Sequence, residues 1–236
     1  MLIEFKVKNY RSIKNEQVFT MAKSSTKELE DTNTFLTPEK KKPIKLLRSA
    51  TIYGANAAGK SNLLKAMNVM KRIVLNSDSK IKRGTKLPVT PFLLDNDTSD
   101  EPTELEIIFI SQEVRYQYGF VLNNKMILEE WLYAFPEGIA QTWFERNYNE
   151  ETQINDWYFG SKLTGNKKIW SESTRDNALF LSTAIQLNSE QLKPVYDWFN
   201  DIFHILDSTA RLDPSFTYEL YQEEKYRTEI NKFLAI

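Results

Sequence analysis

The chain has 236 residues, of which 41% are hydrophobic and 27% charged, a balance typical of a globular protein. It contains no cysteine and a single histidine, His204, which excludes disulfides, thiolate zinc sites, cysteine nucleophiles and multi-histidine metal centres. The formal net charge of -1 conceals an asymmetry, because residues 1–86 carry 19 Lys and Arg against 7 Asp and Glu, whereas the remainder carries 12 against 25.

The first 45 residues predict two strands followed by a long loop. Residues 2–8 alternate apolar and charged side chains, as in a half-buried strand, and a second short strand is expected at 17–21. The polar segment 23–45, with its prolines and the run Lys40-Lys41-Lys42, predicts an exposed loop. The start lacks the layout of a signal peptide, and no apolar run approaches the roughly 18 residues of a spanning helix, so we expect a cytoplasmic protein without a membrane partner.

A strand, a glycine turn and a helix are predicted next. Residues 46–53 form a β-rich run that leads into Gly54. In 61–76 the leucine, methionine, isoleucine and valine side chains recur at helical spacing. The glycine turn therefore lies directly before the N-terminus of a helix.

The middle of the chain predicts an antiparallel meander. Strands are expected at 89–92, 103–110, 114–122, 125–134 and 140–146. Asn123-Asn124 predicts a two-residue hairpin turn between two of them.

The last 60 residues or so predict a short strand and then helices. The apolar run 178–181 indicates the strand, and 189–206 has the spacing of an amphipathic helix. Asp213-Pro214 is a helix start signal, with Asp as cap and Pro in the first turn, so a further helix is expected over 215–236.

Residues Gly54 to Ser61, Gly-Ala-Asn-Ala-Ala-Gly-Lys-Ser, fit the P-loop pattern G-x-x-x-x-G-K-[ST], or Walker A. Small residues let backbone N–H groups surround phosphates, and the following helix directs its positive end at them. Lys60 is expected to reach the β- and γ-phosphates and Ser61 to coordinate Mg²⁺. The motif therefore predicts a nucleotide and Mg²⁺ as ligands, and a GTPase is set aside because residues 124–127 lack the Asp of a guanine motif. The alternative, a chance glycine turn that caps a helix, has less support because strand and helix signals flank the motif.

With the segment Asn9-Tyr10-Arg11-Ser12-Ile13, this motif resembles the ABC/SMC-like AAA-type ATPases, the branch that includes RecF, the OLD nucleases and ATPases of bacterial anti-phage systems. The stretches 91–94, 102–107 and 177–182 extend the resemblance over most of the chain. It implies an α/β P-loop NTPase fold: an N-terminal lobe with a mixed sheet, an antiparallel meander at about 89–147 and a C-terminal helical segment.

The resemblance also implies a set of nucleotide-binding residues. They are Gly54, Asn56, Ala57, Ala58, Gly59, Lys60, Ser61, Asn62, Arg11 and Ser12. Lys60 is the catalytic residue of this set and Ser61 its metal ligand. For Arg11 and Ser12 the implied role is to hold phosphate or ribose, and a solvated turn after the first strand is the alternative.

By this resemblance residues 1–187 are the ATP-binding lobe and 188–236 begin a helical arm, while the half with Walker B and signature motifs is absent. None of the seven glycines follows a serine, and the nearest Walker B imitation, 126–130, lacks the Asp and suits a strand with an acidic end. Gln186 is offset from the family's metal-sensing glutamine and suits a surface position at a helix start, and His204 suits a helix face. We therefore expect the chain alone to bind nucleotide weakly and to hydrolyse it negligibly.

The resemblance implies an ATP-binding subunit or fragment that couples ATP·Mg²⁺ to dimerisation or to control of a nuclease or other effector, in anti-phage defence or DNA maintenance. The expected partner is either a second copy of this chain, in a homo-oligomer, or a chain that supplies the missing half. A non-catalytic assembly module and a small P-loop kinase are alternatives, the kinase being disfavoured because alternating βα units are lacking.

DNA is a further possible partner. The cations at 40–42, 45, 48, 80, 82 and 83 could neutralise phosphates, although solvated loops explain them more simply.

Overall fold

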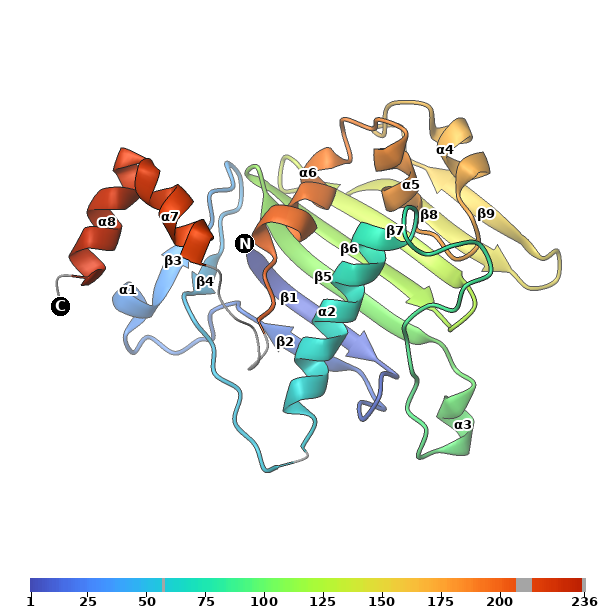
Figure 1. The fold of residues 1–236 in the computed structure, drawn as a ribbon, viewed down its shortest axis with the longest axis horizontal. Helices are drawn as coiled ribbons and strands as arrows, with labels where there is room; N and C mark the ends of the chain where they lie inside the picture. Colours follow the sequence, from blue (N-terminus) through green and yellow to red (C-terminus); the bar gives the residue numbers. More distant parts are fainter. Residues whose placement is uncertain (57, 207–213, 235–236) are drawn as a thin grey trace. The chain divides into compact units, whose positions relative to one another are not determined.

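The computed structural model describes residues 1–56, 58–206 and 214–234 and separates the chain into two units, Met1–His204 and Ile205–Ile236. The first unit is built on a seven-stranded sheet in the order β2-β1-β5-β6-β7-β8-β9 (Figure 1). Its strands are β1 Leu2–Lys8, β2 Gln17–Thr20, β5 Thr103–Ser111, β6 Val114–Leu122, β7 Ile127–Phe135, β8 Gln141–Asn149 and β9 Ile154–Phe159. All its described strand pairs are antiparallel, so the expected mixed sheet is not found there.

The meander is present as β5 to β9, with two corrections to its limits. Residues 89–92 do not form a strand, and β9 was not predicted. A turn between β6 and β7 is confirmed, but it covers 123–126 rather than two residues, with the N–H of Asn123 bonded to Met126 O at 3.1 Å. The Asn123 side chain accepts hydrogen bonds from the N–H groups of Lys125 (2.8 Å) and Met126 (3.0 Å). This side chain thus replaces strand hydrogen bonds at the turn.

Helices cover one face of the sheet (Figure 1). They include α2 Lys60–Asn76, α4 Lys167–Ser173, α5 Phe180–Gln186, α6 Lys193–Asp197 and the π-helical turn η1 Trp198–Ile202. Leu105, Ile107 and Phe109 of β5 are fully buried, and the Phe109 ring stacks on Trp198 with centroids 4.1 Å apart. The core therefore lies between this face and the helices.

Two short elements differ from the prediction. The apolar run 178–181 enters helix α5 instead of a strand, because Phe180 and Leu181 donate their N–H groups to the buried carboxylate of Glu130. The helix expected over 189–206 is shorter and is divided into α6 and η1, while residues 189–192 and 203–206 are not helical. Periodicity identified the apolar face but not the change in helix type.

A small two-stranded sheet, β3 Thr34–Leu36 with β4 Lys45–Leu47, follows helix α1 Glu30–Asn33. The segment 23–45 is therefore more ordered than the predicted loop. Only the start of the predicted strand 46–53 pairs, and it pairs with β3. Residues 48–56 contain no strand, and Ile52 and Tyr53 are exposed there.

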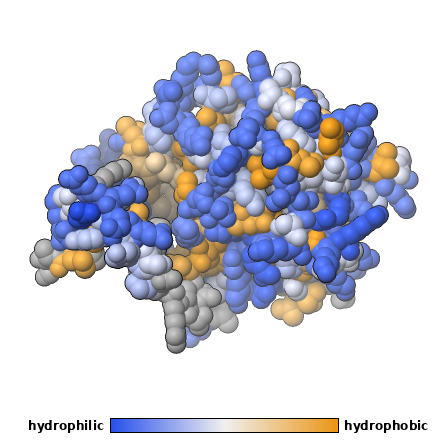
Figure 2. Space-filling model, turned by 45° about the horizontal axis from the view of Figure 1, so that its top comes forward, coloured by the Kyte–Doolittle hydropathy of each residue, from blue (hydrophilic) through white to orange (hydrophobic). Residues whose placement is uncertain are grey.

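The second unit contains helices α7 Pro214–Gln222 and α8 Glu224–Leu234. The single helix expected over 215–236 is thus interrupted at Glu223, and the predicted cap Asp213 lies outside the described residues. No helix in the described residues is long and apolar enough to cross a membrane. On the face drawn in Figure 2, hydrophobic residues form separate patches among hydrophilic ones.

Candidate functional site

The glycine-rich loop leads directly into α2. Gly59, the residue before the helix, has φ +87°, and a Cβ atom there would lie 3.1 Å from Ser12 Oγ. Both the backbone angle and the space favour glycine. No side chain caps α2, and its first turn, Lys60 to Leu63, carries no acidic residue. The N–H groups of this turn are therefore suited to an anion.

Lys60 binds the loop that precedes it. Its Nζ donates to the carbonyl oxygens of Gly54 (2.6 Å) and Ala55 (2.7 Å). The ammonium group thus lies within the loop, where phosphate oxygens would compete with the two carbonyls for it. The Ser61 side chain is exposed at the same helix end.

Ser12 joins this loop from the turn after β1. Asn62 Nδ2 donates to Ser12 Oγ at 2.7 Å, which links the first turn of α2 to the β1 turn. A pocket of about 380 Å³ opens between them, and its lining includes Ser12, Lys14, Tyr53, Gly59 and Lys60. Lys14, absent from the predicted set, adds a second ammonium group.

Arg11 does not line that pocket. Its Nε donates to the Tyr10 hydroxyl at 3.1 Å, and its guanidinium lies 5.6 Å from the centre of the Tyr10 ring. Tyr10 in turn donates to the carbonyl of Lys65 on α2, at 3.4 Å. Arg11 therefore stabilises the β1 turn in this conformation, while Ser12 faces the loop.

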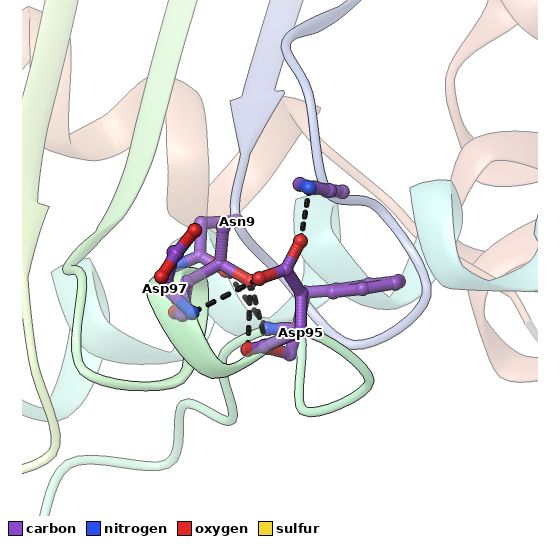
Figure 3. A network of polar contacts seen from close by, with 6 residues as sticks. Asn9, Asp95 and Asp97 are labelled. Carbon is purple, nitrogen blue, oxygen red and sulfur yellow. Dashed lines mark hydrogen bonds and ion pairs between the residues drawn. The ribbon is translucent and has the colours of Figure 1, made fainter.

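A buried asparagine holds the β1 turn in place (Figure 3). Asn9 is fully buried, and its Nδ2 donates to the carbonyls of Thr98 (2.9 Å) and Glu101 (2.8 Å). Its Oδ1 accepts the N–H of Phe92 at 2.8 Å. Asn9 belongs to the Asn-Tyr-Arg-Ser segment, and that segment is the sequence feature that could have indicated its role in holding the β1 turn.

A salt bridge reinforces the attachment of the β1 turn. Lys14 pairs with Asp95, whose other carboxylate oxygen accepts the N–H of Asp97 at 2.9 Å (Figure 3). Asp95 thereby caps the short helix α3 Asn96–Ser99, and the Lys14 hydrogen bond lowers the pKa of Asp95. Lys14 is consequently held at the edge of the pocket.

The ten predicted nucleotide-binding residues do not all lie in the same place. Seven lie together in the loop and first turn of α2, namely Gly54, Asn56, Ala58, Gly59, Lys60, Ser61 and Asn62. Ser12 is added by its hydrogen bond, and Arg11 is turned to Tyr10. Ala57 lies outside the described residues. The ammonium groups, the hydroxyls and the uncapped helix N-terminus have the chemistry that binds a polyphosphate. Nucleotide binding by these residues stays a prediction.

Glu130, which ends the Walker B imitation, has a structural place. It is fully buried and accepts hydrogen bonds from Tyr118 Oη (2.9 Å) and the N–H groups of Phe180 (2.6 Å) and Leu181 (3.1 Å). Burial raises the pKa of Glu130. The helix that it caps, α5, is bonded to the C-terminal part of α2 through Ser182 Oγ and Val74 O (2.6 Å). That part lies away from the P-loop end.

Gln186 and His204 also differ from their predicted positions. Gln186 is the exposed last residue of α5, not a residue at a helix start. His204 follows η1 outside any helix, with its Nε2 2.9 Å from the carbonyl oxygen of Asp201. The described residues contain no group of three or more His, Cys, Asp or Glu placed to hold a metal ion.

A comparison with protein families gives a match over most of the chain. The model described as "AAA domain, putative AbiEii toxin, Type IV TA system" (AAA_21) matches residues 49–231. No curated protein matches the chain.

Proposed function

The chain belongs to the AAA_21 family of P-loop ATPase domains, and from this premise we propose that residues 54–61 bind ATP with Mg²⁺. The observation that carries the proposal is the loop itself, with Gly59 at positive φ before an uncapped helix. Lys60 would hold the β- and γ-phosphates, and Ser61 would provide a hydroxyl ligand to Mg²⁺. Ser12 and Lys14 would contact the same nucleotide from the β1 turn.

The chain is proposed to bind nucleotide but to hydrolyse it negligibly by itself. ATP hydrolysis needs a group that orients water and supports the metal. Glu130, the end of the Walker B imitation, is committed to capping α5. Further residues would come from a second copy, or from a chain or segment with Walker B and signature motifs.

The biological role proposed is control of an effector, such as a nuclease, by ATP-dependent assembly in the cytoplasm. The family description, which names a toxin of a type IV toxin–antitoxin system, supports a defence context over DNA maintenance. The antiparallel order of the described sheet lacks the βα units of small P-loop kinases, which disfavours that alternative. A non-catalytic assembly module remains the competing function.

The test is Mg·ATP binding to the full chain, measured by isothermal titration calorimetry. Lys60→Ala removes the ammonium group that lies in the loop and is expected to weaken binding about tenfold or more, as loss of a charge-assisted contact does. Lys65→Ala, on the exposed side of the same helix, is the matched control and should bind as the unmodified chain. Equal binding by Lys60→Ala and the unmodified chain would refute the proposed site.

Turnover separates the ATPase subunit from the assembly module. The chain alone is expected to release far less phosphate than about 1 per second, a normal enzyme rate. A candidate partner that carries the missing motifs should raise this rate if the chain is an ATPase subunit. Continued binding without turnover, whatever partner is added, would favour the assembly module.

A further inference from the structure

A row of exposed cations lies at the end of α2 that is opposite to the P-loop. The loop that follows α2, residues 77–88, carries Lys80, Lys82, Arg83 and Lys86, and all four are exposed. Leu87 N donates to Asn124 O at 2.9 Å, which brings the β6–β7 turn and its Lys125 beside this loop. We call these five residues the basic edge.

The backbone of this loop is fixed from the inside. Arg175 Nη2 donates to the carbonyls of Ser77 (2.9 Å), Asp78 (2.8 Å) and Ile81 (2.9 Å). The nearly fully buried Asn177 donates through Nδ2 to the carbonyls of Lys82 (2.9 Å) and Thr85 (3.0 Å). These bonds turn loop carbonyls inward, so the cations are displayed on an ordered backbone.

The same place contains a pocket of about 440 Å³. Its lining is Arg83, Gly84, Lys125, Thr174, Arg175, Asp176 and Asn177. The buried Nε of Arg175 has no hydrogen-bond partner among the described residues. Asp176 is the acidic member of this lining, against three cationic side chains. The pocket therefore suits an anion.

The basic edge differs from the lysine-rich loop earlier in the chain. There, Lys40 pairs with Glu113 (3.4 Å), Lys41 with Glu137 (2.7 Å) and Lys45 with Glu30. Within the described ranges, no carboxylate lies within 4.0 Å of a charged nitrogen of the basic edge. The two cation-rich segments are thus alike in sequence but not in structure.

We infer that the basic edge binds the phosphodiester backbone of nucleic acid without reading bases. Four exposed cations on an ordered loop, with Lys125 on the neighbouring β6–β7 turn, match the dense negative charge of a nucleic-acid backbone. A protein partner would need an apolar or aromatic centre in the surface. The exposed positions of 79–88 are instead Ser, Lys, Arg, Gly, Thr and Pro.

This site is separate from the nucleotide site. Helix α2 has 17 residues, which corresponds to about 25 Å between its ends. The P-loop precedes its first residue and the basic edge follows its last. Nucleic-acid binding should therefore persist in Lys60→Ala, so that failure of one site does not imply failure of the other.

The experiment is fluorescence anisotropy with the full chain and labelled duplex DNA, or duplex RNA of the same length, at about 50 to 200 mM salt. We expect both duplexes to bind, with log affinity falling by about 0.9 per contacted DNA phosphate for each log unit of salt. The variant Lys80→Gln/Lys82→Gln/Arg83→Gln should lower this slope by about 2.7 for DNA. These side chains are exposed, so an unchanged melting temperature verifies that the variant is folded.

The matched control removes the same amount of charge elsewhere. Lys40→Gln/Lys41→Gln/Lys42→Gln should leave the affinity within about twofold, a change of under about 0.5 kcal/mol by the free-energy relation. Equal loss in both triple variants would show a net-charge effect and overturn the inference. So would absence of binding at about 50 mM salt. Displacement of the duplex by poly-glutamate at equal charge would overturn it in favour of an acidic protein.

Discussion

At the scale of single residues, Asn9 shows why the β1 turn needs an asparagine. Its side chain bonds to three backbone groups of the segment 92–101, and its own φ is +52°. Asparagine tolerates this left-handed conformation better than most residues do. One residue thus provides both the bend of the turn and its attachment, and the position of Ser12 depends on both.

The substitution Asn9→Ala is expected to lower the free energy of unfolding by about 3 kcal/mol, because it leaves buried polar groups unpaired and places alanine at positive φ. Urea unfolding followed by tryptophan fluorescence measures this change. Asn15→Ala, at an exposed position nearby, is the control and should change the value by less than about 0.5 kcal/mol. A loss in Asn9→Ala no larger than in the control would contradict the role of Asn9.

At the scale of elements, the sequence predicted those whose pattern is decided locally. The alternation in β1 and the helical spacing in α2 were recognised because each element buries one face, and the P-loop followed from its glycine spacing. The strand predicted at 178–181 was wrong because Glu130, about 50 positions earlier, caps a helix there. The strand predicted over 46–53 was wrong from residue 48 onward, because a strand requires a partner strand and the local sequence does not show whether one is available. Lys14 was missed because its partner Asp95 is remote in sequence.

The pH dependence of stability should reveal the buried cap of α5. Because burial raises the pKa of Glu130, the folded state binds its proton more tightly than the unfolded state does. Its stabilising contribution is therefore largest below the ordinary carboxyl pKa and is lost as the pH rises through the raised pKa. The advantage of the unmodified chain over Glu130→Gln, measured by urea unfolding, should shrink as the pH rises above about 4, the ordinary carboxyl pKa.

Glu129→Gln is the matched control, since Glu129 is the exposed neighbour on the same strand. A trend of the same size in both variants would mean that the pH effect does not come from the buried carboxyl group. The direction matters as well: an advantage that grows with pH would indicate that Glu130 is stabilised as a carboxylate by its N–H donors and by the nearby Arg146.

At the scale of the whole molecule, folding partly neutralises the charge asymmetry between residues 1–86 and the remainder of the chain. Cations from the first 86 residues pair with acidic residues from the rest, as in Lys6 with Glu106 (3.1 Å) and Lys41 with Glu137 (2.7 Å). Such surface pairs contribute little stability each, but they neutralise charge between the two parts. The described side chains of the basic edge form no such ion pair, which is why we assign this cation-rich segment an external anion.

The last prediction concerns the C-terminal limit of the folding unit. The sequence predicted a lobe that ends at residue 187, whereas the first unit of the structure extends to His204. Trp198 and Phe199 are buried against Phe109 of the sheet. Removing even one such ring from a core costs about 3–5 kcal/mol, which is comparable to the stability of a whole domain.

A chain ending at His204 should therefore retain one cooperative urea transition, and a chain ending at Leu187 should lose it. Cooperative unfolding of the shorter chain at the same midpoint would show that α6 and η1 are an attachment rather than part of the core. The loss of cooperativity would instead place the boundary after the aromatic cluster, a boundary that helical spacing in 189–206 could not locate.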